Sequence, residues 1–132
     1  MNIPLYTAVT NGIKVSVSVA YQPAYSKPLH QEFIYAYRVS IENQTDQTVQ
    51  LLRRHWHIWD SNGIWREIEG EGVVGEQPVL TPYQSHAYVS GSSLGSEWGK
   101  MFGTFQFQTL PDRQIMEVQI PEFQLIAPHK WN

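Results

Sequence analysis

Apolar and polar residues alternate with a period of two along most of this chain. The alternation begins after Gly12, where small or charged residues separate Ile13, Val15, Val17 and Val19. Successive side chains of a β-strand point to opposite faces, so this pattern is typical of a strand with one buried face. We therefore predict a first strand from about Ile13, with its aliphatic side chains in the core.

The longest regular alternation covers residues 33–42. Its odd-numbered positions are all aliphatic or aromatic: Phe33, Tyr35, Tyr37, Val39 and Ile41. The pattern predicts a strand whose odd-numbered face is buried. The Asn43-Gln44-Thr45-Asp46 segment that follows favours a turn, because Asn and Asp side chains hydrogen-bond to nearby backbone groups.

Residues 49–60 predict the next strand, and large side chains occupy both of its faces. One face has Leu52, Trp56 and Ile58, and the other has Arg53, His55, His57 and Trp59. We assign Trp56 to the core and Trp59 to the surface. The Asn62-Gly63 pair is a strong hairpin signal, so residues 64–69 should form the returning strand.

Three further strands are predicted at residues 86–90, 101–109 and 114–120, the last of them ended by Pro121. No stretch keeps a helical period for more than about one turn. The expected fold is an all-β, immunoglobulin-like antiparallel sandwich of about seven to eight strands. Residues 1–132 should form one domain, with about ten N-terminal residues and the C-terminal tail extended or flexible.

Composition narrows the classes of partner. The chain has 42% hydrophobic and 16% charged residues, a net charge of −3 and no cysteine. A negative chain is a poor partner for nucleic acid, which requires a clustered positive face. Without cysteine there is no thiolate zinc site and no cysteine nucleophile. Neither a secretory signal nor a membrane-length apolar segment is recognisable, so we expect a soluble cytoplasmic protein with no membrane partner.

A glycine-rich run at residues 70–78 matches the G-x-G-x-x-G pattern through Gly70, Gly72 and Gly75. That pattern indicates a pyrophosphate site only where it opens a helix. Pro78 stands where the helix would need a backbone donor, and the valines favour extended structure. We therefore interpret the run as a structural turn. The alternative is a nucleotide, pyrophosphate or divalent-metal complex bound at Gly70–Gly75.

His55 and His57 are two residues apart on a predicted strand, so both rings could reach one metal ion. A third ligand could come only through folding, from His30, His86, Asp60 or Glu67. The alternative is a pair of neutral imidazoles on a half-exposed sheet face. Apart from this open metal question, we expect no cofactor.

Trp56, Trp59 and Trp65 flank one predicted hairpin. Clustered tryptophans either fill a core or anchor a binding surface. We predict that Trp59 is a partner-binding anchor, with Arg53 or Arg54 beside it for cation–π or carboxylate contacts. No G-x-S-x-G elbow and no distinctive carboxylate pair is present, so the sequence favours a protein that is not an enzyme.

Four blocks of sequence resemble the ApaG family, in order and with matching intervals. They are residues 36–43, 49–56, 67–78 and 120–125. The resemblance implies a fibronectin type III-like sandwich in a family whose molecular activity is unsettled. It links the chain to cobalt resistance and magnesium efflux, and related domains look like interaction modules. The chain departs from the family pattern at Pro82-Tyr83 and at residues 95–99.

Together these observations predict a small binding or adaptor domain that presents loops and an aromatic sheet face to a protein partner. A second copy of the chain could also bind at this aromatic sheet face, so a homodimer is possible in principle.

Overall fold

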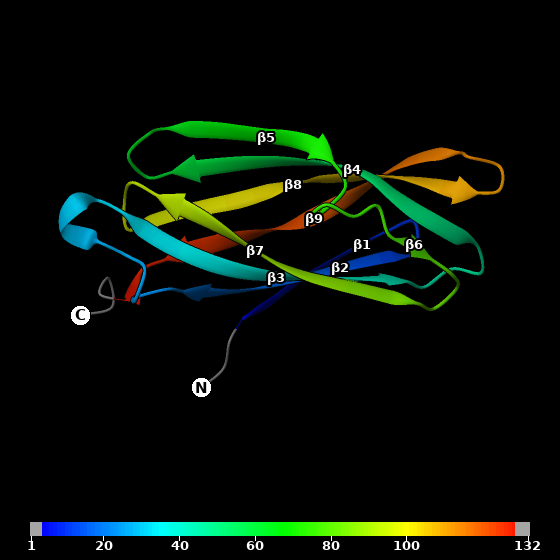
Figure 1. Cartoon of the computed structure of the whole chain (residues 1–132), viewed down its shortest axis with the longest axis horizontal. Coiled ribbons are helices and arrows are strands. Elements are labelled where there is room, and N and C mark those ends of the chain that lie inside the picture. Colours follow the sequence, from blue (N-terminus) through cyan, green and yellow to red (C-terminus); the bar gives the residue numbers. More distant parts are fainter. Residues whose placement is uncertain (1–3, 129–132) are drawn as a thin grey trace.

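The computed structural model describes residues 4–128, and these form two antiparallel β-sheets packed face to face (Figure 1). The predicted all-β sandwich is confirmed. One sheet has the strand order β1-β2-β3-β7: Leu5–Thr10, Ile13–Tyr21, Phe33–Asn43 and Ser85–Leu94. The other has the order β5-β4-β8-β9: Trp65–Glu71, Thr48–Asp60, Trp98–Leu110 and Ile115–Ile126. The two-residue strand β6 (Val79–Leu80) also pairs with β4.

The described residues include one 3₁₀ turn, η1 (Pro28–His30), and no helix long and apolar enough to cross a bilayer.

The core between the sheets is built from the positions that the period-two pattern selects. All six odd-numbered side chains of β3 are buried, Asn43 among them, and Ile13, Val15 and Val17 from β2 are fully buried. From β4, Trp56 is 3% exposed, as predicted. The assignment of Leu52 to this face was wrong. A register shift between Leu51 and Arg53 turns Leu51 into the core and leaves Leu52 half-buried.

Several strands extend beyond their predicted bounds. Asn11 and Gly12 both have positive φ, and this tight turn joins β2 to β1, in a segment that the sequence analysis expected to be extended or flexible. Pro121 does not end β9. It lies where the β8–β9 register shifts between Met101 and Gly103, in an edge strand that tolerates the loss of a backbone donor.

The glycine run forms a tight turn without a helix. Val74 and Gly75 have φ values of 47° and 78°, and Val73 and Glu76 exchange two backbone hydrogen bonds across them. Positive φ at both central positions defines a type I′ turn. Gly72 also has positive φ, and a Cβ there would lie 2.3 Å from the Glu76 carbonyl oxygen. The conformation and close approach at this turn require glycine.

Asn43 ties three segments together at one end of the sandwich. Its fully buried side chain donates to the carbonyl oxygens of Gln47 and Leu80 at 2.7 and 3.1 Å. Its carboxamide oxygen accepts from the Thr45 amide and hydroxyl. The side chain therefore holds the β3–β4 turn against β6.

Replacing Asn43 should destabilise the fold, because buried carbonyl groups would lose their donor. We expect Asn43→Ala to lower the free energy of unfolding by about 3 kcal/mol. The neighbouring Gln44→Ala is a matched control at an exposed side chain, with an expected change below about 0.5 kcal/mol. Urea unfolding of both variants measures the difference, and equal losses would contradict this role for Asn43.

Three substitutions in the glycine run should change the stability of the protein in an order set by backbone strain. Val74→Asn should stabilise the protein by about 0.5 kcal/mol, because Asn tolerates left-handed φ better than a β-branched residue. Gly75→Ala should destabilise it by about 1 kcal/mol through φ alone, since no atom lies within 4 Å of the new Cβ. Gly72→Ala should destabilise it more, through φ and a steric clash. Thermal unfolding tests this order, and a different ranking would exclude the type I′ interpretation.

Candidate functional site on the outer face of the five-stranded sheet

Strand pairing assembles rows of functional side chains on the face of the β5-β4-β8-β9 sheet that points away from the core. Because Trp56 and Ile58 are buried, the side chains between and beside them face outward. Across to β5, Trp59 is opposite Trp65, His57 opposite Glu67, His55 opposite Glu69 and Arg53 opposite Glu71. Across to β8, Trp59 is opposite Lys100, His57 opposite Phe102 and His55 opposite Thr104.

An aromatic cluster occupies one end of this face and consists of Trp59, Trp65, Trp98 and Phe102. Trp59 meets Trp98 edge-to-face at 5.0 Å between ring centroids, and Trp65 meets Phe102 edge-to-face at 6.2 Å. The Lys100 ammonium lies 5.6 Å from the Trp59 ring centroid, within cation–π range. Trp65 is 58% exposed and Trp98 41% exposed. These rings form a surface patch and not a part of the core.

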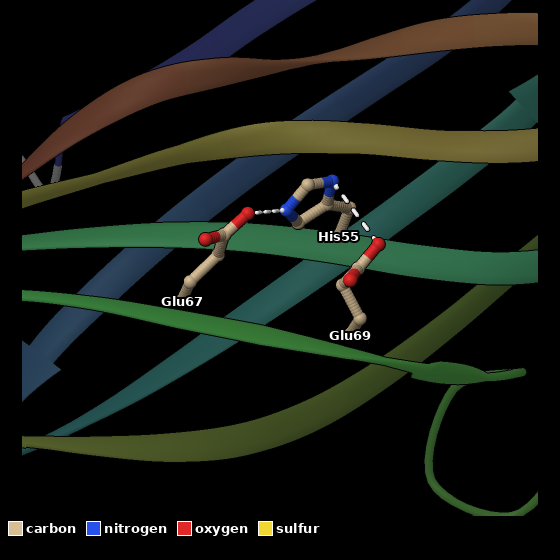
Figure 2. A network of polar contacts seen from close by, with 3 residues as sticks. All are labelled: His55, Glu67 and Glu69. Carbon is tan, nitrogen blue, oxygen red and sulfur yellow. Dashed lines mark hydrogen bonds and ion pairs between the residues drawn. The ribbon is translucent and has the colours of Figure 1, made fainter.

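A histidine cluster, His55, His57 and Glu67, adjoins the aromatic cluster. Figure 2 shows the His55 ring between two carboxylates of β5. Its Nε2 contacts Glu67, and its Nδ1 lies 3.5 Å from Oε1 of Glu69. The His57 ring is 4.5 Å from that of His55 and stacks on Phe102 at 5.0 Å with an interplanar angle of 13°.

Of the four residues that the sequence offered as a third metal ligand, folding brings Glu67 to the histidine pair. His30 lies in η1, and His86 lies in β7 on the other sheet, 3.7 Å from Glu76. The Asp60 carboxylate is buried and accepts hydrogen bonds from the Gly95 amide at 2.7 Å and from the Ser96 hydroxyl. Asp60 therefore fastens the β4–β5 hairpin to the β7–β8 loop.

The two arginines predicted beside Trp59 point in different directions. Arg53 is exposed on the outer face, where it lines a hollow of about 360 Å³ with Thr104, Gln106 and Glu117. Arg54 lies on the opposite side of β4. Its Nη1 donates to the carbonyl oxygens of Glu71 and Gly72 at 2.9 and 3.0 Å. Arg54 therefore binds the glycine run and does not lie beside the aromatic cluster of the outer face.

The glycine run directs backbone carbonyl oxygens at the Arg54 guanidinium. A phosphate site would instead need free backbone N–H groups directed at the ligand. Gly70 packs so closely on Arg54 that an added Cβ would lie 2.9 Å from the guanidinium nitrogens. The amide of Gly72 donates to the Leu52 carbonyl, and those of Val73 and Glu76 donate within the turn. Gly70, Gly72 and Gly75 thus build a turn whose polar groups are largely used by the protein itself.

A second hollow, of about 310 Å³, opens between the two sheets near β7 and is lined by Tyr37, Arg54, Trp56 and Tyr88, among others. Burial raises the pKa of both tyrosines, so each phenol is neutral. Among the described residues, the Tyr88 and Ser92 hydroxyls are buried without a hydrogen-bond partner. The charged group that lines this hollow is Arg54, whose Nη1 already donates to the glycine run.

The sequence analysis missed Glu69, Phe102 and Lys100 as members of the outer face. Counting outward from a two-residue Asn62-Gly63 turn would have put the β4–β5 register out by one residue, because the loop has three residues, Ser61-Asn62-Gly63, between Asp60 and Ile64. Phe102 and Lys100 belong to β8, far along the chain, and no local signal fixes their register with β4.

Comparisons with known proteins agree on one family. The model of the ApaG domain matches residues 23–109. The chain is 43% identical over 126 residues to Protein ApaG of Brucella canis, and equally identical to Protein ApaG of Paramagnetospirillum magneticum, with 96% of each chain covered in both cases.

A solved structure supports the same assignment. The crystal structure of an ApaA protein from Bordetella pertussis superimposes with a TM-score of 0.85 at 38% sequence identity, covering 88% of this chain and 94% of that one. Family model, relatives and solved structure all extend over most of the sandwich. The chain therefore belongs to the ApaG family.

Proposed function

We propose that this chain is a protein-binding module whose docking surface is the outer face of the β5-β4-β8-β9 sheet. The observation that carries the proposal is the aromatic cluster. Its rings contact one another across three strands, yet Trp65 keeps 58% and Trp98 41% of its surface exposed. Tryptophan is enriched among residues that dominate binding energy, and an exposed aromatic patch on a regular sheet is typical of an interaction site.

The charges around the cluster favour a partner with an apolar centre and basic flanks. Carboxylates on this face outnumber cations: Glu67, Glu69, Glu71, Glu117 and Glu122 against Arg53 and Lys100. Lys100 is partly neutralised by Glu122, whose Oε1 is 3.7 Å from its Nζ. An acidic rim steers a basic partner to the patch and disfavours nucleic acid.

The remaining expectations about the biology of the chain stay predictions. These are a cytoplasmic location and the link to cobalt resistance and magnesium efflux that the family resemblance implies. A second copy of the chain is a less favoured occupant of this face, because two acidic surfaces would repel each other.

Trp65→Ala should weaken binding with little effect on folding. Loss of an exposed aromatic anchor at the centre of an interface removes about 2 kcal/mol or more, which is about thirtyfold in affinity. We would identify proteins retained by the immobilised wild-type chain and measure their affinity for both forms by surface plasmon resonance. Sedimentation of the free chain would detect self-association.

Val89→Ala is the matched control, because Val89 is 60% exposed on β7 of the other sheet. It should bind as tightly as the wild type. If no retained protein distinguishes Trp65→Ala from Val89→Ala, the outer face is not the docking surface and the proposal fails.

Two tryptophans of neighbouring strands should differ sharply in their effect on stability. Trp56 is buried, so Trp56→Ala should lower the free energy of unfolding by about 3–5 kcal/mol. Trp65 is mainly exposed, so Trp65→Ala should lower it by less than about 1 kcal/mol. Guanidinium unfolding of both variants checks the contrast. A large loss in Trp65→Ala would mean that the aromatic cluster serves the fold.

A further inference from the structure

We propose that His55, His57 and Glu67 bind one divalent transition-metal ion of the zinc type. The inference goes beyond the proposed function, because it concerns an ion and requires no protein partner. It rests on the convergence of three ligating side chains from two paired strands, each able to offer one ligand atom.

The distances suit a single ion. One ligand atom from each residue lies within 4.8 Å of the other two. Zinc binds imidazole nitrogen and carboxylate oxygen at about 2.0–2.2 Å, which separates neighbouring ligands by roughly 3.4 Å in tetrahedral geometry. Glu67 is 58% exposed and on an edge strand, so its side chain can rotate to close the remaining gap.

Two neighbours hold the imidazoles in place. The His57 ring lies flat against Phe102, which fixes its plane. The Glu69 carboxylate lies behind His55, 3.5 Å from Nδ1. A metal ion on Nε2 would leave the proton on Nδ1, facing Glu69. A carboxylate behind a ligating histidine orients the ring and increases its basicity.

Metal binding would replace an existing contact. The His55 Nε2 and the Glu67 carboxylate are now in direct contact with each other. The ion would take the place of this contact, with the imidazole proton on Nδ1, where Glu69 lies.

The donor set selects the class of ion. Two imidazoles and one carboxylate suit zinc and its neighbours in the first transition series, whereas magnesium and calcium prefer oxygen ligands only. Three protein ligands leave a coordination position open. On this face that position is exposed to solvent beside the hollow lined by Arg53 and Thr104.

The direct test is calorimetric titration of the intact, tag-free chain with zinc chloride, with magnesium chloride as the negative control. We expect one zinc ion bound per chain and no heat from magnesium. In a parallel NMR experiment on the wild type, Co²⁺ should broaden the ring signals of His55 and His57 and spare those of His30 and His86. Absence of zinc binding, or broadening at His86 equal to that at His55, would overturn the site.

Variants identify the ligands. His55→Gln, His57→Gln and Glu67→Gln should each weaken zinc binding by at least about tenfold. Glu69→Gln should weaken it by about tenfold, through orientation of His55. His86→Gln is the matched control, because His86 also lies beside a glutamate but belongs to no cluster of three ligands among residues 4–128. It should bind as the wild type does.

Circular dichroism checks that each variant is folded, and for any variant that unfolds the wild-type NMR result decides. Unchanged affinity in the three ligand variants, or an equal loss in His86→Gln, would refute the assignment. Failure of zinc binding would leave the partner experiment with Trp65→Ala unaffected, so the two proposals are separable.

Discussion

The pairing of β4 on both of its edges is the constraint on which the rest of the structure depends. Hydrogen bonding to β5 on one side and β8 on the other fixes the orientation of every side chain from Arg53 to Asp60. A shift of one residue would turn the tryptophan in the core toward solvent and the histidines into the core. The register irregularity between Leu51 and Arg53 sets this orientation, because it changes which side chains face inward.

Three polar side chains inside the sandwich hold loops in place. Asn43 joins the β3–β4 turn to β6, Asp60 joins the β4–β5 hairpin to the β7–β8 loop, and Arg54 holds the carbonyl groups of the glycine run. The histidines and exposed tryptophans of the outer face hold no loop in place. They contact side chains of the neighbouring strands on the surface of the sheet, which is why we look for a binding site there.

Local patterns were enough to predict the two-sheet fold. They also predicted those residues of the site that lie on β4. The odd-numbered face of β3 and the position of Trp56 follow directly from period-two alternation. The Asn62-Gly63 pair indicates the β4–β5 hairpin, but not the three-residue loop that places Glu67 opposite His57. The register irregularities at Leu52 and Pro121 could not be predicted, because they depend on pairing with distant strands. The same holds for Phe102 and Trp98, which reach the site only through the β4–β8 ladder.

The composition of β5 has a consequence for the behaviour of the chain in concentrated solution. This strand is the open edge of its sheet, and Glu67, Glu69 and Glu71 all project from it into solvent. On its other side, Arg66 reaches across to the Ser93 carbonyl of β7 and occupies part of the neighbouring edge. Strands with repeated like charges resist pairing with copies of themselves. The carboxylate row therefore disfavours edge-to-edge pairing of this sheet with other copies of the chain, the step by which exposed edge strands aggregate.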